Sequence, residues 1–309
     1  MQKAWILIAF VGLGLIWGGA FVAIKVLVTA LPPMTAVALR LTIAVPFLWV
    51  VFVLMKRPMR VPKNLVTKSA IAGLFMIGIP YCFVAWGETK VPAGLAGIIN
   101  GSVPIFTTLL TVMSISPWYD HRQKLSKTLI FGLLLGFAGL ITISLPRLDW
   151  DAPASFWGAM ACVVMALCYS LSNVLNARLL TNSNKVTITA NTFLQHWTSW
   201  IFVVCVALVS GEKFEWSTVF VPPVFGSLLF LGCLSGATAL LIYYALIREI
   251  GAVKTSAITY LIPVAAVVLD LILLNTKLDL SSLVGAGLIL TGILFIRTNA
   301  RAPVQQVNE

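Results

Sequence analysis

Charged side chains are scarce in this sequence. Asp, Glu, Lys and Arg make up only 10% of its 309 residues, whereas 60% are hydrophobic and the mean hydropathy is +0.99. Soluble domains carry roughly 25% charged residues, so this chain has too little polar surface to cover a water-soluble globule. The composition excludes an ordinary cytosolic enzyme, a disordered tail protein and a disulfide-rich secreted domain, and it indicates an α-helical membrane protein.

The residues and motifs of enzyme, metal and nucleotide chemistry are also few. There are two histidines, His121 and His196, and the five cysteines form no CxxC pair. The sequence contains no HExxH or GxSxG motif and no GxxxxGKS/T phosphate loop, which are patterns of metalloproteases, hydrolases and ATPases. These absences argue against an enzyme, against a bound metal or other cofactor, and against ATP hydrolysis by this chain.

Long apolar runs account for most of the chain. A spanning helix needs about 20 mostly apolar residues, and ten segments meet this need between turn-forming residues such as Pro58, Pro92 and Pro117. The sequence therefore predicts an all-α polytopic membrane protein with ten transmembrane helices. The predicted spans are residues 5–27, 34–55, 69–87, 93–115, 128–145, 154–175, 187–210, 224–247, 255–274 and 281–296.

Basic residues are distributed unevenly between the predicted loops. With both termini placed in the cytoplasm, fifteen of the 21 Lys and Arg residues fall in inner segments, and Lys25 and Arg40 fall within spans. Cytoplasmic loops of membrane proteins carry such an excess, which explains the net charge of +11 without a nucleic-acid partner. The bias predicts a multi-pass protein of a bacterial inner membrane with both termini in the cytoplasm. The outer segments carry only Lys90, Arg147, Lys213 and Lys277.

The two halves of the sequence resemble each other. Gly132–Ser144 aligns with Gly285–Ile296 at an offset near 153 positions, and the fourth span of each half carries a proline, Pro104 or Pro263. Because each half has five predicted helices, an odd number, the second half enters the membrane from the opposite side. Such an inverted-topology repeat is the physical basis of alternating access. The predicted units are a first five-helix repeat at 1–148, a second at 149–298 and a short cytoplasmic tail at 299–309.

Several stretches carry a resemblance to a known family. They are IWGGAFVAIK at 16–25, ALRLTIA at 38–44, GLLLGFAGLITIS at 132–144 and the run from Gly232 to Ile296. Over nearly its whole length the chain resembles the EamA-type transporters of the drug/metabolite transporter superfamily. The resemblance implies ten helices in two five-helix repeats and a transport activity, without specifying the substrate. The family often has a Gly-Glu pair after the fourth and ninth helices, and this chain lacks it, so no role of that glutamate carries over.

Polar and aromatic side chains recur along one face of several predicted spans. An unsatisfied amide or hydroxyl inside an apolar span costs roughly 1–3 kcal/mol, so each needs a partner or a wet cavity. Hydrogen bonds between helices explain any one of them. Their recurrence predicts a central cavity lined by the first, third, fourth, sixth, seventh and ninth helices. The favoured substrate-binding residues are Trp17, Tyr81, Asn100, Tyr169, Asn173 and Gln195.

Ionisable side chains inside spans are functional candidates because their burial is costly. Arg40, which lies ~9 Å into the second span, either contacts a substrate carboxylate or anchors helix carbonyls. Asp270, in the ninth span, is a candidate carrier of a coupling proton, unless it is hydrated near the outer interface or paired with Lys25 or Arg40. Lys25 either reaches the headgroups or lines the cavity, and we expect Glu88 at the membrane interface.

These observations favour a secondary transporter that exports a small metabolite, such as an amino acid, by alternating access. The main alternative is a multidrug or toxic-compound efflux transporter, for which Asp270 offers the only acid on the predicted faces. A channel is the alternative from another class, but no ring of charged residues marks a continuous pore. The expected partners are the lipid bilayer and a small-molecule substrate, and we expect a monomer, with a homodimer as the alternative.

Overall fold

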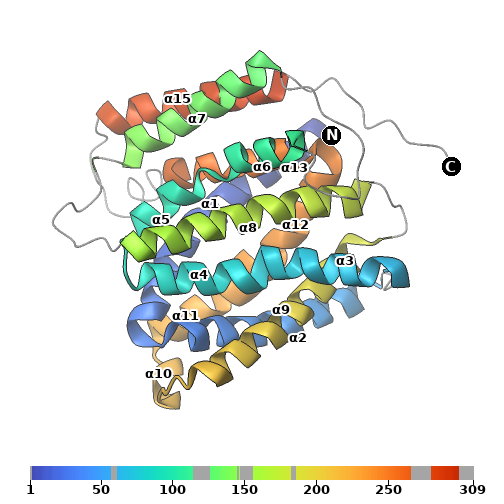
Figure 1. The fold of residues 1–309 in the computed structure, drawn as a ribbon, viewed down its shortest axis with the longest axis vertical. Coiled ribbons are helices and arrows are strands. Elements are labelled where there is room, and N and C mark those ends of the chain that lie inside the picture. The colour runs from blue at the N-terminus through green and yellow to red at the C-terminus, as the bar shows by residue number, and fades with distance from the viewer. Residues whose placement is uncertain are drawn as a thin grey trace.

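The computed structural model describes residues 2–56, 61–113, 126–144, 146, 156–181, 186–265 and 280–298. Within these ranges every regular element is a helix (Figure 1). Seven of the described helices are long and apolar enough to cross a membrane, and three shorter apolar helices accompany them. Each predicted span coincides with at least one of these ten helices, although residues 266–274 of the ninth span lie outside the described residues.

The first half of the chain forms a group of helices that ends at residue 144. Its bounds are α1 (Gln2–Ala30), α2 (Pro33–Leu54), α3 (Lys63–Gly73), η1 (Leu74–Gly78), α4 (Ile79–Glu88), α5 (Ala93–Asn100), α6 (Val103–Val112) and α7 (Lys127–Ser144). The third predicted span is continuous but passes from α3 into α4 through the π-helical stretch η1. The fourth is divided into α5 and α6 at Gly101 and Ser102.

The second half of the chain forms a further series of helices. Its bounds are α8 (Phe156–Thr181), α9 (Ile188–Ser210), α10 (Trp216–Val219), α11 (Pro222–Leu229), η3 (Phe230–Thr238), α12 (Ala239–Ile250), α13 (Ala252–Ser256), η4 (Ala257–Tyr260) and α15 (Leu280–Thr298). Here η3 is a second π-helical stretch, between α11 and α12, and η4 is a 3₁₀ stretch that directly follows α13.

The fourth helix of each half is irregular next to its proline. Pro104 lies in the first turn of α6, where its missing N–H removes no helix bond. The helix that continues from η4 to Ala265 contains Pro263, and the 3₁₀ geometry of η4 comes just before it. Proline cannot donate to the preceding turn, so it favours such departures from α geometry. The two predicted proline positions therefore mark real interruptions.

The helices α7 and α15 lie side by side as a pair at one end of the molecule (Figure 1). Glycines permit this contact, because a Cβ on Gly132 would lie 2.8 Å from the carbonyl oxygen of Gly292, and one on Gly139 would lie 2.6 Å from that of Gly285. Since the lower residue number on α7 meets the higher one on α15, the two helices run antiparallel. Small residues allow such close backbone approach between helices in membranes.

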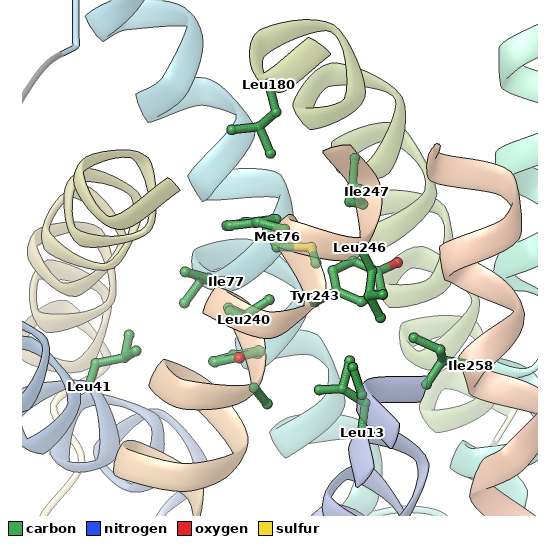
Figure 2. Packing of buried hydrophobic residues seen from close by; sticks show 14 of the residues in the cluster. Leu13, Leu41, Met76, Ile77, Leu180, Leu240, Tyr243, Leu246, Ile247 and Ile258 are labelled. Carbon is green, nitrogen blue, oxygen red and sulfur yellow. The ribbon is translucent and has the colours of Figure 1, made fainter. Parts of the chain in front are cut away.

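The interior contains many polar residues, and much of the exterior is apolar. On α9, Leu208 is 76% exposed and Val209 89% exposed, whereas Gln195 and Ser199 are fully buried. A soluble protein shows the opposite distribution, and exposed apolar faces of this extent need lipid to cover them. One of several apolar clusters in the core includes Leu13, Met76, Tyr243 and Leu246, which come from α1, η1 and α12 (Figure 2).

Candidate functional site

A cavity lies where helices from both halves of the chain meet. Its walls come from α1, α2, η1, α4, α5, α6, α8, η3, α12, η4 and the helical residues that follow η4. Six of the seven residues predicted to bind substrate line it: Trp17, Arg40, Tyr81, Asn100, Tyr169 and Asn173. The fold thus brings together side chains that are far apart in the sequence.

Arg40 supplies a buried positive charge to the cavity wall. Its side chain is only 4% exposed, and its guanidinium carbon lies 4.0 Å from the centroid of the Tyr81 ring. One Nη donates to the carbonyl oxygen of Leu231 at 3.5 Å, and Nε has no partner among the described residues. Within the described part of the chain, no carboxylate forms an ion pair with Arg40. The cation is therefore held by an aromatic face and one weak hydrogen bond.

The position of Arg40 depends on a close contact between α2 and η3. A Cβ on Gly232 would lie 2.8 Å from the carbonyl oxygen of Arg40, so only glycine lets the two backbones approach this closely. This approach brings the carbonyl of Leu231 within reach of the guanidinium. The contact explains how a residue from the first half of the chain is fixed by the second half.

Asn100 supplies an unpaired acceptor. It is the last residue of α5 and lies at the interruption of the fourth helix, where its side chain is buried against the cavity. Its Oδ1 atom has no hydrogen-bond partner among the described residues. Buried amide oxygens are almost always paired, so this one is suited to accept a hydrogen bond from a ligand or from water.

An aromatic wall faces these polar groups. The Trp17 ring lies 5.0 Å from the Tyr243 ring, centroid to centroid, and its Nε1 donates to the carbonyl oxygen of Ser235 at 3.1 Å. The Tyr243 hydroxyl donates to Asn173 Oδ1 at 2.9 Å, and Asn173 Nδ2 donates to Thr107 at 3.4 Å. These contacts orient the rings and leave the wall rigid.

Sequence reasoning missed Tyr243 as a lining residue. Tyr243 follows the π stretch of the third helix of its half, as Tyr81 does in the first half. The internal repeat does not identify it, because an offset near 153 positions carries Tyr81 onto Leu234. Both tyrosines nevertheless line the same cavity.

Gln195 does not line this cavity. Its Nε2 donates to Asn176 Oδ1 at 2.7 Å, and its Oε1 accepts from the hydroxyl of Tyr244. Asn176 Oδ1 also accepts from Asn191 Nδ2 at 3.1 Å. All four residues are fully buried, and their hydrogen bonds join α8, α9 and α12 and extend to α3 through Ser69, which donates to Asn191 Oδ1 at 2.6 Å. Gln195 therefore has a structural role, because its side chain forms hydrogen bonds between helices.

The charged residues near the cavity differ in part from expectation. Glu88, which we expect at the membrane interface, has a side chain that is fully buried in the protein. The reason is a close packing of α4 against α8, where a Cβ on Gly87 would lie 3.0 Å from Cys162 Sγ. Lys25 points to the same place and donates to the backbone oxygen of Glu88 at 2.6 Å. Asp270 lies outside the described residues.

The described residues contain no group of three or more His, Cys, Asp and Glu side chains that could hold a metal ion. The cavity instead combines one cation, one free amide oxygen and aromatic faces. Chemically, this set can bind an anionic group, accept a hydrogen bond from a donor group and contact an apolar portion of a small molecule.

Comparison with known proteins gives consistent matches. The model of the EamA-like transporter family matches at residues 4–145 and 156–298. An uncharacterized transporter from Archaeoglobus fulgidus is 26% identical over 305 residues, which are 96% of this chain and 99% of the relative. Protein PagO from Salmonella typhimurium is also 26% identical, over 87% of this chain and 85% of its own.

Two further matches extend this comparison. The uncharacterized inner membrane transporter YedA from Escherichia coli is 22% identical over 93% of this chain and 89% of its own. A solved crystal structure matches with a TM-score of 0.73 at 18% identity, covering 97% of this chain and 99% of that one. At such low identity the structural match shows a shared fold.

Proposed function

Because this chain belongs to the EamA-like transporter family, we propose that it is a secondary transporter that exports a small metabolite with a carboxylate group, such as an amino acid. The observation that carries the substrate class is Arg40, a buried cation without an acidic partner among the described residues. Leaving a buried charge uncompensated is costly. A substrate carboxylate would compensate it with paired hydrogen bonds from the planar guanidinium.

The other polar group of the cavity fits the same class of substrate. Asn100 Oδ1 is free to accept a hydrogen bond from an ammonium group. The ring of Trp17, which is held by Ser235 and Tyr243, offers an apolar face for a side chain. A carboxylate, an ammonium and an apolar portion are the three parts of an amphipathic amino acid.

Efflux of cationic drugs is less well supported. None of the described residues that line the cavity is acidic, and the one charged lining residue is Arg40. A bound organic cation would be repelled by this guanidinium instead of attracted. The cavity therefore favours a zwitterionic or anionic solute over the drug alternative.

For the mechanism we propose alternating access by two inverted five-helix repeats, residues 1–148 and 149–298. Support comes from irregularities that recur in corresponding helices, namely η1 and η3 in the third and the interruptions near Pro104 and Pro263 in the fourth. Discontinuous helices at corresponding places in two halves are typical of transporter binding sites. In this proposal all ten apolar helices cross the membrane.

The proposed location is a bacterial inner membrane with both termini in the cytoplasm. The excess of basic residues in the predicted inner segments supports this orientation. The Escherichia coli relative is named as an inner membrane transporter, which is consistent with this location. Transport would require no ATP hydrolysis by this chain.

Counterflow of radiolabelled amino acids in proteoliposomes tests the substrate class. We expect the wild type to exchange at least one amino acid and Arg40→Gln to exchange it at least about tenfold more slowly, because the carboxylate loses a charged partner worth roughly 1.5–3 kcal/mol. Arg248→Gln is the matched control, since Arg248 is exposed at the end of α12. Wild-type exchange by Arg40→Gln, or transport of organic cations alone, would contradict the proposal.

A further inference from the structure

Glu88 has an environment that no structural role accounts for. It is the last residue of α4, yet its side chain is fully buried and neither carboxylate oxygen has a hydrogen-bond partner among the described residues. Exposed ends of helices usually keep their carboxylates in water. A buried, unpaired carboxylate costs several kcal/mol if it is ionised, so a residue of this kind inside a membrane protein indicates function.

The burial of Glu88 results from the packing of α8 over the end of α4. A Cβ on Gly87 would lie 3.2 Å from the carbonyl oxygen of Gly158, and one on Gly158 would lie 2.6 Å from Lys90 Cβ. These two glycines bring the backbones together above the carboxylate. Water is therefore kept out by the contact between helices, and a small separation of the helices would readmit it.

The charged and titratable groups around Glu88 come from three neighbouring helices. Lys25 of α1 and Arg40 of α2 are close enough to act on the carboxylate electrostatically, and the thiol of Cys162 on α8 interacts with it as well. Lys25, however, donates to the backbone oxygen of Glu88 and not to the carboxylate. The cation thus holds α1 against α4 and leaves the carboxyl group itself without a partner.

This group lies directly beyond one end of the cavity. Val84, one helical turn before Glu88, lines the cavity, as do Phe21 and Ile24 beside Lys25. One turn of helix is about 5.4 Å. The hydrogen bond between Lys25 and Glu88 therefore joins α1 to α4 next to the cavity, and separation of these two helices would break it.

We propose that Glu88 is a proton-binding residue of the transport cycle, neutral while α1 and α4 are closed over it and ionised when they separate and water enters. The inference rests on the proposed transport function. A neutral carboxyl group tolerates the closed, dry environment far better than a carboxylate does. Proton binding therefore stabilises the closed arrangement, and proton release stabilises the open one, in which water can contact the carboxylate.

The proton site can be tested without a substrate. Infrared difference spectra of the reconstituted protein, recorded between acidic and alkaline samples, report the carbonyl stretch of each carboxyl group that gains a proton. We expect one band of the wild type to be lost in Glu88→Gln, to shift in Glu88→Asp and to persist in Glu215→Gln, whose side chain is exposed. Glu88→Gln should fold, because the amide is neutral and has nearly the shape of the protonated carboxyl group. An unchanged band pattern in Glu88→Gln would overturn the inference.

Counterflow separates this inference from the proposed substrate class. With an amino acid that the wild type exchanges, we expect Glu88→Gln to retain exchange within about threefold and to lose the dependence of its rate on pH. If the wild type exchanges no amino acid while the Glu88 band titrates, the substrate class is wrong and the proton site stands. If exchange occurs and Glu88→Gln keeps both the wild-type band and the wild-type pH profile, the proton site is wrong.

Discussion

Two asparagines in the cavity wall differ in what they leave unpaired. Asn100 lines the cavity, and its Oδ1 atom has no hydrogen-bond partner among the described residues. Asn173 uses its amide twice within the protein, accepting from Tyr243 and donating to Thr107. Both asparagines are predicted to bind substrate, but substitution of each is therefore expected to affect folding and transport differently.

Asn100→Leu should lower transport at least about tenfold with little change in thermal stability, because it removes an acceptor that serves no other residue. Asn173→Leu should lower stability as well, by roughly 1–3 kcal/mol, because Tyr243 and Thr107 lose a buried partner. Counterflow normalised to folded protein, and melting curves in detergent, measure the two effects. A loss of stability in Asn100→Leu equal to that in Asn173→Leu would contradict this distinction.

At the scale of elements, the start of α2 is held by a residue from the other half of the chain. Its first residues include Pro33 and offer no side-chain cap of their own. Glu212, which follows α9, accepts from the backbone N–H of Thr35 at 2.7 Å and of Met34 at 3.2 Å, and from the Thr35 hydroxyl at 2.9 Å. A carboxylate at this place satisfies free N–H groups and interacts favourably with the helix dipole.

Glu212→Ala should therefore destabilise the protein by about 1–2 kcal/mol, the usual effect of losing a helix cap. The matched control is Glu215→Ala, because Glu215 is exposed and makes no capping hydrogen bond to α10. Thermal melting of both variants in the same detergent gives the comparison. Equal melting temperatures for the two variants would show that the carboxylate contributes nothing to α2.

At the scale of the whole molecule, the contact between α7 and α15 relates the two halves to each other. Gly132 meets Gly292, and Gly139 meets Gly285. The repeat offset near 153 positions carries Gly132 onto Gly285 and Gly139 onto Gly292, so it exchanges one contact for the other. A two-fold axis through the helix pair would produce this exchange, which is the relation that an inverted repeat requires.

The exchange predicts matched effects of matched substitutions. Gly139→Ala and Gly285→Ala should each destabilise the protein by roughly 1–3 kcal/mol, because the added Cβ would overlap the facing helix. A Cβ on Gly139 would lie 2.6 Å from the carbonyl oxygen of Gly285, and one on Gly285 would lie 2.5 Å from Cγ1 of Ile143. Gly287→Ala is the control on the same helix, since a Cβ there meets nothing within 4 Å. Tolerance of all three substitutions in melting experiments would argue against this helix pair.

Much of the fold was predictable from composition and pattern. Apolar runs bounded by proline predicted where the helices lie, since the length of a membrane helix is set by the bilayer. The likeness of the halves predicted irregular fourth helices at Pro104 and Pro263. Six of the residues chosen for polarity within apolar spans, including Arg40 and Asn100, line the cavity. Polar groups inside such spans need partners or water, which made them visible in the sequence.

The tertiary structure decided which neighbour each helix face meets. A helical period predicts that Gln195 lies on a polar face, but whether that face meets the cavity or the amides of α8 depends on how the helices are rotated and packed. The π stretches η1 and η3 also change which residues face the interior, because a π turn contains more residues than an α turn. Tyr81 and Tyr243, which follow these stretches, therefore lie on a different side of the helix than a regular period predicts. The burial of Glu88 was likewise decided by the tertiary structure. Its place at the end of a span is a property of the sequence, whereas its burial follows from the approach of α8 at Gly87, a contact between residues distant in the chain.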